Sequence, residues 1–406
     1  MISVVRWLAV VGLLLPWGLQ GAVRLGTDVL ADSGFSILAG KRIGLITNPS
    51  GVNRRLQPTL EILRKARGVR LVALFSAEHG LYGNVPAGQE IRSHVDNRIG
   101  LPVYSLYGPG RVRKPTASML KGLDALVYDI QDTGCRSYTF ISTLGLAMEA
   151  CADAGIEFVV LDRPNPLGGE RVEGPVLDPR FRSFVGQWEI PYVYGLTCGE
   201  LARLIKGERW IAKPCRLTVV RMQGWRRDMA WRDTGLSWIP TSPHIPRGDS
   251  PLHYVSTGLL GSVGGVNIGL GFKMPFECVT APWLDASRFS QQLNRYGLKG
   301  VKFEPFSIAY NGNQQKGVRI RFNDPAHAPL AAINFYLLEA TQRLTGRDLC
   351  AEAVKAGKSF DLFDKVCGTD ATRRALAAGK SATSIVASWK PGEEAFLKRR
   401  QKYLLY

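Results

Sequence analysis

Polar side chains able to bind or transfer protons follow four short apolar runs of the chain. They are Asn48 after the first run, Glu78 and His79 after the second, Asp129, Gln131 and Asp132 after the third, and Asp162, Arg163 and Asn165 after the fourth. The carboxyl ends of parallel strands meet at one edge of a sheet, so we expect these side chains to converge on one site. Each residue type alone also favours turns, and the inference therefore depends on their number.

The residue types in this set suit acid–base chemistry. Glu78 directly follows an apolar run, and a glutamic acid in a partly apolar cleft can keep its proton and act as a general acid. Asp129, Asp132 and Asp162 are candidates for the second carboxylate that glycoside hydrolysis normally uses. Arg136 and Arg163 are able to bind a carboxylate with two hydrogen bonds. These residues alone indicate a hydrolase with a polar site or a binding protein.

Several other chemistries lack their motifs. The sequence contains no G-x-S-x-G, no G-x-G-x-x-G after the first strand, and no Lys-Ser or Lys-Thr in the glycine-rich stretch 258–271. C-x-x-C and H-E-x-x-H are also absent from the sequence. We therefore expect neither a cofactor nor a metal.

Apolar runs that alternate with helical patterns predict the scaffold. Strands are expected over 42–47, 69–75, 103–106, 123–128, 157–161 and 217–220, and helices over 56–66 and 140–154. A capping box, Thr197 with Glu200, opens a further helix. This order predicts an α/β fold with a doubly wound, mostly parallel sheet. The pattern changes near Trp238, so we expect a larger domain over 23–238 and a smaller α+β domain over 239–406, with helices over 331–344 and 393–406.

Charge and cysteine content limit the partners. The 406 residues carry 52 Lys and Arg against 34 Asp and Glu, a net charge of +18. This excess fits a solvated basic surface or an anionic partner, but no helix-turn-helix, zinc finger or RNA-binding aromatic motif is present, so we expect no nucleic acid. Seven widely spaced cysteines do not form a disulfide framework, although Cys350 and Cys367 are left open as a pair.

The N-terminus reads as an export signal. Residues 1–22 combine Arg6, an apolar run from Trp7 to Leu15, and Gly21-Ala22 as a small-residue cleavage site. The alternative, a retained anchor, is disfavoured because the run is short and Pro16 interrupts it. We therefore expect a periplasmic or secreted protein without stable membrane insertion after cleavage.

Three long motifs carry a family resemblance. Residues 76–80 (SAEHG), 128–140 (YDIQDTGCRSYTF) and 161–166 (LDRPNP) resemble the NamZ-type exo-β-N-acetylmuramidases, and the similarity runs from about residue 25 to the end. The resemblance implies a Rossmann-like catalytic domain over 23–238 joined to a smaller C-terminal domain, with a cleft between them. It implies removal of terminal N-acetylmuramic acid from muramic-acid-containing cell-wall saccharides, without a cofactor. It makes Glu78 the expected general acid and Asp132, followed by Asp129, the expected second carboxylate. The substrate-binding residues expected from it are Asn48, His79, Gln131, Arg136, Tyr138, Asp162, Arg163, Asn165 and Glu277.

The chain departs from the family pattern in one stretch. Where members carry Glu-Gly-Thr-Asn and Ser-Glu-Gly-Arg-Gly-Thr, this chain has residues 261–264 (GSVG) and 267–272 (NIGLGF). Tyr194 stands where His is usual, and His244 where Asn is usual. The loss of two Glu and one Arg leaves three hypotheses open: an active muramidase, a silent binder of muropeptides or envelope polymers, and a glycosidase for another amino sugar.

Overall fold

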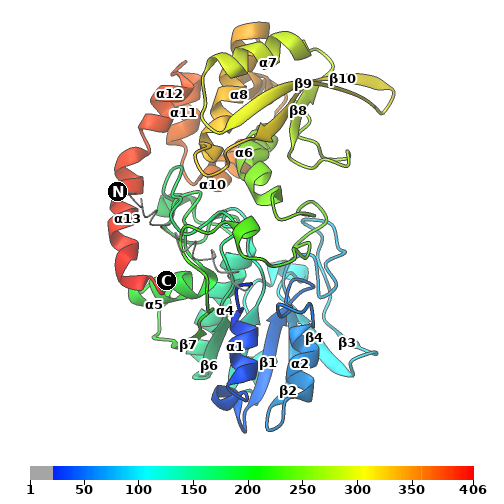
Figure 1. The fold of residues 1–406 in the computed structure, drawn as a ribbon, viewed down its shortest axis with the longest axis vertical. Coiled ribbons are helices and arrows are strands. Elements are labelled where there is room, and N and C mark those ends of the chain that lie inside the picture. Colours follow the sequence, from blue (N-terminus) through cyan, green and yellow to red (C-terminus); the bar gives the residue numbers. More distant parts are fainter. Residues whose placement is uncertain (1–21, 358) are drawn as a thin grey trace, which may run out of the picture.

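The computed structural model describes residues 22–357 and 359–406. Two layered units lie one above the other along the long axis of the molecule (Figure 1). The predicted signal segment, apart from Ala22, lies outside the described residues. The cysteines, all within the described part, are free thiols, so Cys350 and Cys367 are not paired. No helix among the described residues is long and apolar enough to cross a membrane.

The larger unit is built on a mixed sheet that is parallel except at one edge. Its strand order is β3-β4-β2-β1-β5-β6-β7. The strands are β1 (Arg42–Thr47), β2 (Arg70–Ser76), β3 (His94–Asp96), β4 (Leu101–Ser105), β5 (Ala125–Asp129), β6 (Glu157–Leu161) and β7 (Arg216–Val220). Only β3 pairs antiparallel. Without it the order is that of a Rossmann-like sheet, whose strand order reverses between β1 and β5, and ligands bind at such reversal points.

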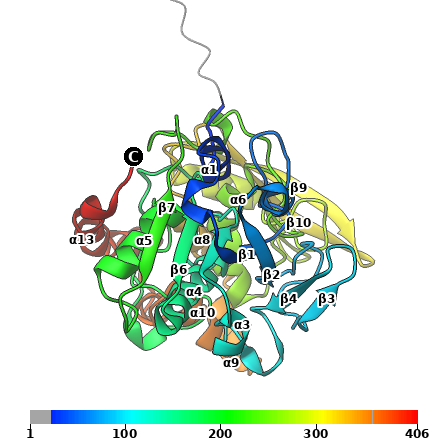
Figure 2. The ribbon, with the colours of Figure 1, turned by 90° about the horizontal axis from the view of Figure 1, so that it is seen from below.

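Helices cover both faces of this sheet, as Figure 2 shows from below. They are α1 (Gly26–Asp32), α2 (Thr59–Lys65), α3 (Ala117–Leu120), α4 (Phe140–Ala154) and α5 (Cys198–Gly207). Alternate residues of β1 pack into different cores, Ile43 and Leu45 on one face and Ile46 on the other. Burial on both faces explains why the strands read as continuous apolar runs, and it confirms the predicted doubly wound fold.

The smaller unit has an antiparallel sheet in the order β8-β10-β9. Its strands are β8 (Cys278–Ala281), β9 (Val301–Tyr310) and β10 (Asn313–Phe322). Its helices are α6 (Ser250–Val263), α7 (Ala286–Arg295), α8 (Leu330–Thr345), α9 (Leu349–Lys355), α10 (Asp361–Cys367), α11 (Ala371–Ala377) and α12 (Ala382–Ala387). Helix α6 includes the start of the glycine-rich stretch 258–271, where the sequence pattern predicted no helix.

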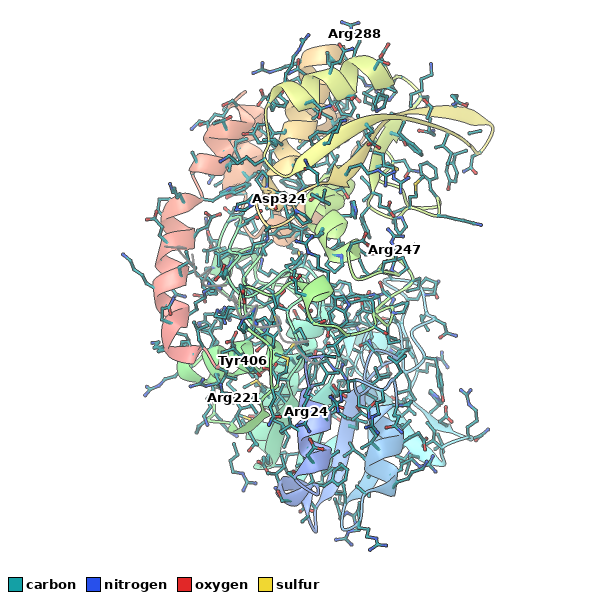
Figure 3. All side chains as sticks on the ribbon, in the orientation of Figure 1. Arg24, Arg221, Arg247, Arg288, Asp324 and Tyr406 are labelled. Atoms are coloured by element: carbon teal, nitrogen blue, oxygen red, sulfur yellow. The ribbon has the colours of Figure 1, made fainter. Side chains whose placement is uncertain are left out.

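The last helix, α13 (Lys390–Arg400), leaves the smaller unit and returns to the larger one along its side (Figure 1). Arg400 at its end donates hydrogen bonds to the carbonyls of Gly169, Tyr194 and Gly195. Tyr406 lies beside Arg221 on the larger unit, with the Arg221 guanidinium carbon 5.3 Å from the Tyr406 ring centre (Figure 3). The chain therefore joins its two units at the α6 junction and again at the C-terminus.

Candidate active site

Glu78 is held in place by the loop that follows β2. One carboxylate oxygen, Oε1, accepts a hydrogen bond from the backbone of Gly88 at 2.9 Å, and Oε2 accepts one from the hydroxyl of Thr139 at 2.6 Å. The Tyr107 phenol is a neighbour, because burial and then the negative charge of Glu78 raise the pKa of Tyr107. Glu78 is buried, so two fixed donors orient a carboxyl group that is largely shielded from solvent.

His79 turns the chain away from this carboxylate. Its φ of +71° is left-handed, a conformation that allows the loop to fold back. The Nδ1 atom of His79 lies 2.8 Å from the carbonyl oxygen of Val85. Burial and then the charge of His79 lower the pKa of His244, which places the two imidazoles near one another.

Aromatic rings connect this region to a cavity of about 660 Å³ between the two units. Tyr138 lies 5.8 Å from Tyr254, and Tyr254 lies 5.1 Å from Phe276, measured between ring centres. Tyr254 and Phe276 line the cavity together with Ser137, Ile268 and Leu270. Burial raises the pKa of Tyr254 well above its usual value, and the charge of Glu78 adds to this, so the carboxylate is close to the cavity wall.

Asp132 is the second candidate carboxylate. Its Oδ2 accepts hydrogen bonds from the Tyr194 hydroxyl at 2.5 Å and from the Gly134 amide at 2.7 Å, while Oδ1 has no partner among the described residues. Burial raises the pKa of Asp132 to about 6 despite these donors. Burial raises the pKa of Tyr138, and the charges of Asp132 and Glu78 contribute. Tyr138 therefore lies within the field of both carboxylates.

Asp129 has a different environment. Its Oδ1 lies 2.5 Å from Nε of Arg163, and its Oδ2 accepts a hydrogen bond from Thr27 at 3.1 Å. Arg163 also donates to the carbonyl of Val52 at 2.6 Å. Both members of the ion pair are buried. The pair binds neighbouring strand ends together, and its charges are directed at each other.

The other strand-end residues form a supporting network. Asp162 accepts hydrogen bonds from Thr197, Gly199 and Tyr406, and burial raises its pKa to about 6. Asn165 donates to the carbonyl of Leu196. Thr197 is the N-cap of α5 with Glu200 as its partner, so the predicted capping box is confirmed.

Asn48 and Gln131 lie at the strand-order reversal. The side-chain oxygen of Asn48 accepts hydrogen bonds from the amide and hydroxyl of Ser50, and Gln131 donates to the carbonyls of Asp132 and Pro164. Nδ2 of Asn48 and Oε1 of Gln131 are buried without a hydrogen-bond partner in the described part of the chain. These two atoms remain available for a ligand or for ordered water.

Two proposed binding residues have other partners. Arg136 is fully buried and donates to the carbonyls of Pro175, Ile190, Val366 and Cys367, so it joins α10 to the larger unit. Glu277 lies between Arg247 and Arg319 and faces a second cavity. Neither side chain belongs to the group around Glu78.

Tyr107, Thr139 and Tyr254 were not singled out from the sequence as candidate site residues. Thr139 lies in the central motif, two residues after Ser137, which contacts the hydroxyl of Tyr254 at 3.0 Å. Tyr107 and Tyr254 come from distant segments, so local spacing carries no signal for them. Within the described residues, no group of three His, Cys, Asp or Glu side chains is arranged to hold a metal ion.

Two family models together match most of this chain. The N-terminal model of Exo-beta-N-acetylmuramidase NamZ matches residues 43–249, and the C-terminal model matches residues 252–406. The chain belongs to the NamZ exo-β-N-acetylmuramidase family. It is similar to the peptidoglycan beta-N-acetylmuramidase NamZ of Bacillus subtilis, with 40% identity over 95% of this chain and 91% of that protein.

Two solved structures of DUF1343 family proteins from Bacteroides fragilis are similar to this NamZ-family chain. One is 44% identical with a TM-score of 0.88, and the other is 30% identical with a TM-score of 0.72. Each alignment covers 95% of this chain and 99% of the other. The similarity therefore includes both units and the way they are joined.

Proposed function

We propose that this protein is an exo-acting glycosidase that releases N-acetylmuramic acid from the non-reducing end of peptidoglycan fragments. The supporting observation is the Glu78 carboxyl, which Thr139 and Gly88 orient near Tyr254, a residue that lines the cavity between the two units. Aromatic side chains on the cavity wall suit the apolar face of a sugar ring. Membership in the NamZ family and 40% identity to the Bacillus subtilis muramidase support the same reaction.

In this mechanism Glu78 protonates the glycosidic oxygen. Glycoside hydrolysis needs a proton on the leaving oxygen and stabilisation of the positive charge that develops on the sugar. Asp132, rather than Asp129, is assigned the second role, because one of its oxygens has no partner in the described structure while Asp129 is neutralised by Arg163. The 2-acetamido group of the substrate is an alternative internal nucleophile.

The second candidate function is a silent binder of muropeptides on the same scaffold. The apolar residues Ile268 and Leu270 at the cavity favour it, because they replace the Glu and Arg of the family pattern. Under this alternative the saccharide would occupy the cavity without being cleaved.

Activity assays separate the two. Purified protein is incubated with a chromogenic β-N-acetylmuraminide and with muropeptides, and the released sugar is quantified. Glu78→Gln keeps the shape of the side chain but removes the proton, so we expect turnover to fall about 10²- to 10⁴-fold without loss of folding. Glu61→Gln on α2, where the side chain is 42% exposed, is the matched control. Binding without sugar release would favour the silent binder, and a Glu78→Gln rate within a few-fold of wild type would exclude Glu78 from the mechanism.

We further propose that the protein acts in the periplasm or outside the cell. The support is the sequence of residues 1–22. Intact-mass measurement on protein from the native host should show cleavage near Ala22. A mass that retains residues 1–22 would contradict this proposal.

A further inference from the structure

A second and larger cavity, of about 1040 Å³, lies at the junction of the two units. Figure 3 labels Arg247, which lines this cavity, and Asp324, which comes directly before the lining residue Pro325. A single layer of residues, from α6 and from the segment before β8, separates this cavity from the active-site cavity. His253 lines the large cavity while its neighbour Tyr254 lines the active-site cavity, and Glu277 and Phe276 divide in the same way. The two cavities are therefore distinct sites.

Three nitrogen atoms of lining residues are buried and lack hydrogen-bond partners. They are Nε1 of Trp389, Nε of Arg319 and Nδ1 of His253, and none has a partner among the described residues. Trp389 and His253 are each 6% exposed. Buried polar groups are nearly always paired in native proteins, by protein, ligand or ordered water. Nε1 of Trp389 and Nε of Arg319 are donors, whereas Nδ1 of His253 donates or accepts according to its tautomer. Unpaired donors on β10 and at the start of α13, in residues that line one cavity, indicate a ligand that offers hydrogen-bond acceptors.

Charged residues of both signs line the cavity, and two groups of them lie close to the unpaired nitrogen atoms. In the first group the guanidinium groups of Arg247 and Arg319 flank Glu277, beside His253. In the second group Glu393 follows Trp389 by one helical turn, and its Oε1 accepts a hydrogen bond from the Gly174 amide at 2.7 Å. Burial, and to a lesser degree Glu173, raise the pKa of Glu393 to about 7. The first group therefore suits a carboxylate, and the second suits an amide group, which both donates and accepts.

We propose that this second cavity binds a short peptide with a free carboxylate, seated with the carboxylate at Arg319 and an amide at Trp389. Its volume is at the upper end for small-molecule sites and accommodates three or four residues. The choice of a peptide rests on the proposed function, because peptidoglycan carries short peptides with free carboxylates. The separating layer makes this an anchoring site for wall peptide, apart from the site of cleavage.

The test uses titration calorimetry on the full chain. The probe is the free tripeptide L-Ala-γ-D-Glu-meso-diaminopimelate, and N-acetylmuramic acid is titrated in parallel. We expect saturable 1:1 binding of the tripeptide to wild type and to Glu78→Gln alike. Trp389→Phe keeps an aromatic ring but removes the indole N–H, so it should weaken binding about 5- to 10-fold. Trp283→Phe, at a separate surface pocket, is the matched control and should leave the affinity unchanged.

A second variant covers the case in which Trp389→Phe does not fold. Glu393→Gln keeps the shape of the side chain and removes its titration, so tripeptide affinity should change less between pH 6 and pH 8 than in wild type. If neither variant changes the tripeptide affinity or its pH dependence, the assignment to this cavity is wrong. Binding of the sugar alone, sensitive to Trp389→Phe, would overturn the ligand class. Cleavage of the chromogenic muraminide without tripeptide binding would overturn this inference alone, whereas tripeptide binding without cleavage would overturn only the proposed function.

Discussion

Removing the Tyr194 hydroxyl tests whether Asp132 is a carboxyl group with a strongly raised pKa. The folded pKa of about 6 exceeds the ordinary value of 3.8, so folding favours the protonated form. The contribution of protonated Asp132 to the free energy of unfolding is fully present below about pH 4 and is lost as the pH rises through about 6. At about 1.4 kcal/mol per pKa unit, the ionised group costs about 3 kcal/mol at neutral pH. Tyr194 limits this cost by donating to Oδ2 at 2.5 Å.

The variant Tyr194→Phe should therefore destabilise the protein more at high pH than at low pH. A hydrogen bond to the neutral acid contributes about 1 kcal/mol, and one to the carboxylate about 1.5–3 kcal/mol. The loss should grow from about 1 kcal/mol at pH 4.5 to about 2–3 kcal/mol at pH 8. The difference of about one pKa unit should move the pKa of Asp132 from about 6 to about 7. Urea unfolding at a series of pH values, followed by tryptophan fluorescence, measures the loss of stability at each pH.

Two controls isolate the carboxyl group. Tyr192→Phe removes a buried hydroxyl that faces Ser137 instead of an acid, so its effect on stability should be constant with pH. Tyr194→Phe in an Asp132→Asn background should also lose its pH dependence, because the titrating group is gone. A loss of stability for Tyr194→Phe that is equal at pH 4.5 and pH 8, or larger at pH 4.5, would refute the assignment of a raised pKa to Asp132.

Three further predictions concern the supporting structure and the divergent loop. Asp129→Asn leaves Arg163 buried without a counter-charge, so the free energy of unfolding in urea should fall by about 3–5 kcal/mol. The double variant Asp129→Asn/Arg163→Gln should lose less stability than the sum of the two single variants, and a loss equal to that sum would contradict the coupling. Tyr406→Phe removes a hydroxyl that donates to Asp162 and accepts from the Met222 amide, so thermal unfolding should shift by the equivalent of about 1–3 kcal/mol, and an unchanged melting temperature would show that the C-terminal contact is not stabilising. Gly261→Glu with Ile268→Glu and Leu270→Arg should raise the rate on unsubstituted N-acetylmuraminides; an unchanged rate and affinity in the folded protein would mean that the loop is not part of the site.

The local sequence pattern was sufficient to predict the bounds of elements whose burial follows from their own residues. β1, α4 and β6 have the predicted bounds. Strand burial on both faces produces continuous apolar runs, and Gly155 in a left-handed conformation ends α4. β3 was missed because it is a three-residue edge strand, of which only Asp96 is buried. α6 was missed because its glycines have low helix propensity, whereas tertiary contacts stabilise it, among them the Asn334 side chain bonded to Leu260.

The same limit applies to the candidate site. Sequence reasoning placed Asp129 and Asp132 in one motif with similar roles, and the structure separates them. Asp129 is the last residue of β5 and is paired with Arg163 from the next strand end, while Asp132 lies beyond the strand beside Tyr194. The spacing of residues in one segment does not specify which partner another segment supplies. Arg136 illustrates this most clearly, because two of its carbonyl partners are about 230 residues away.

The divergent loop combines a retained backbone with altered chemistry. The glycines expected from the family resemblance stand at 269 and 271, and both are left-handed. A Cβ atom would lie 2.0 Å from the Met274 carbonyl oxygen at 269 and 2.2 Å from the Tyr310 hydroxyl at 271. A Cβ atom at 261 would lie 2.5 Å from the Ile268 side chain. The atom in contact is Cδ1, the end of a side chain that can shift, so a residue larger than Gly at 261 displaces only the Ile268 side chain. The close backbone packing at 269 and 271, together with the place of Ile268 and Leu270 on the cavity wall, favours a remodelled wall over a loop that has lost its role.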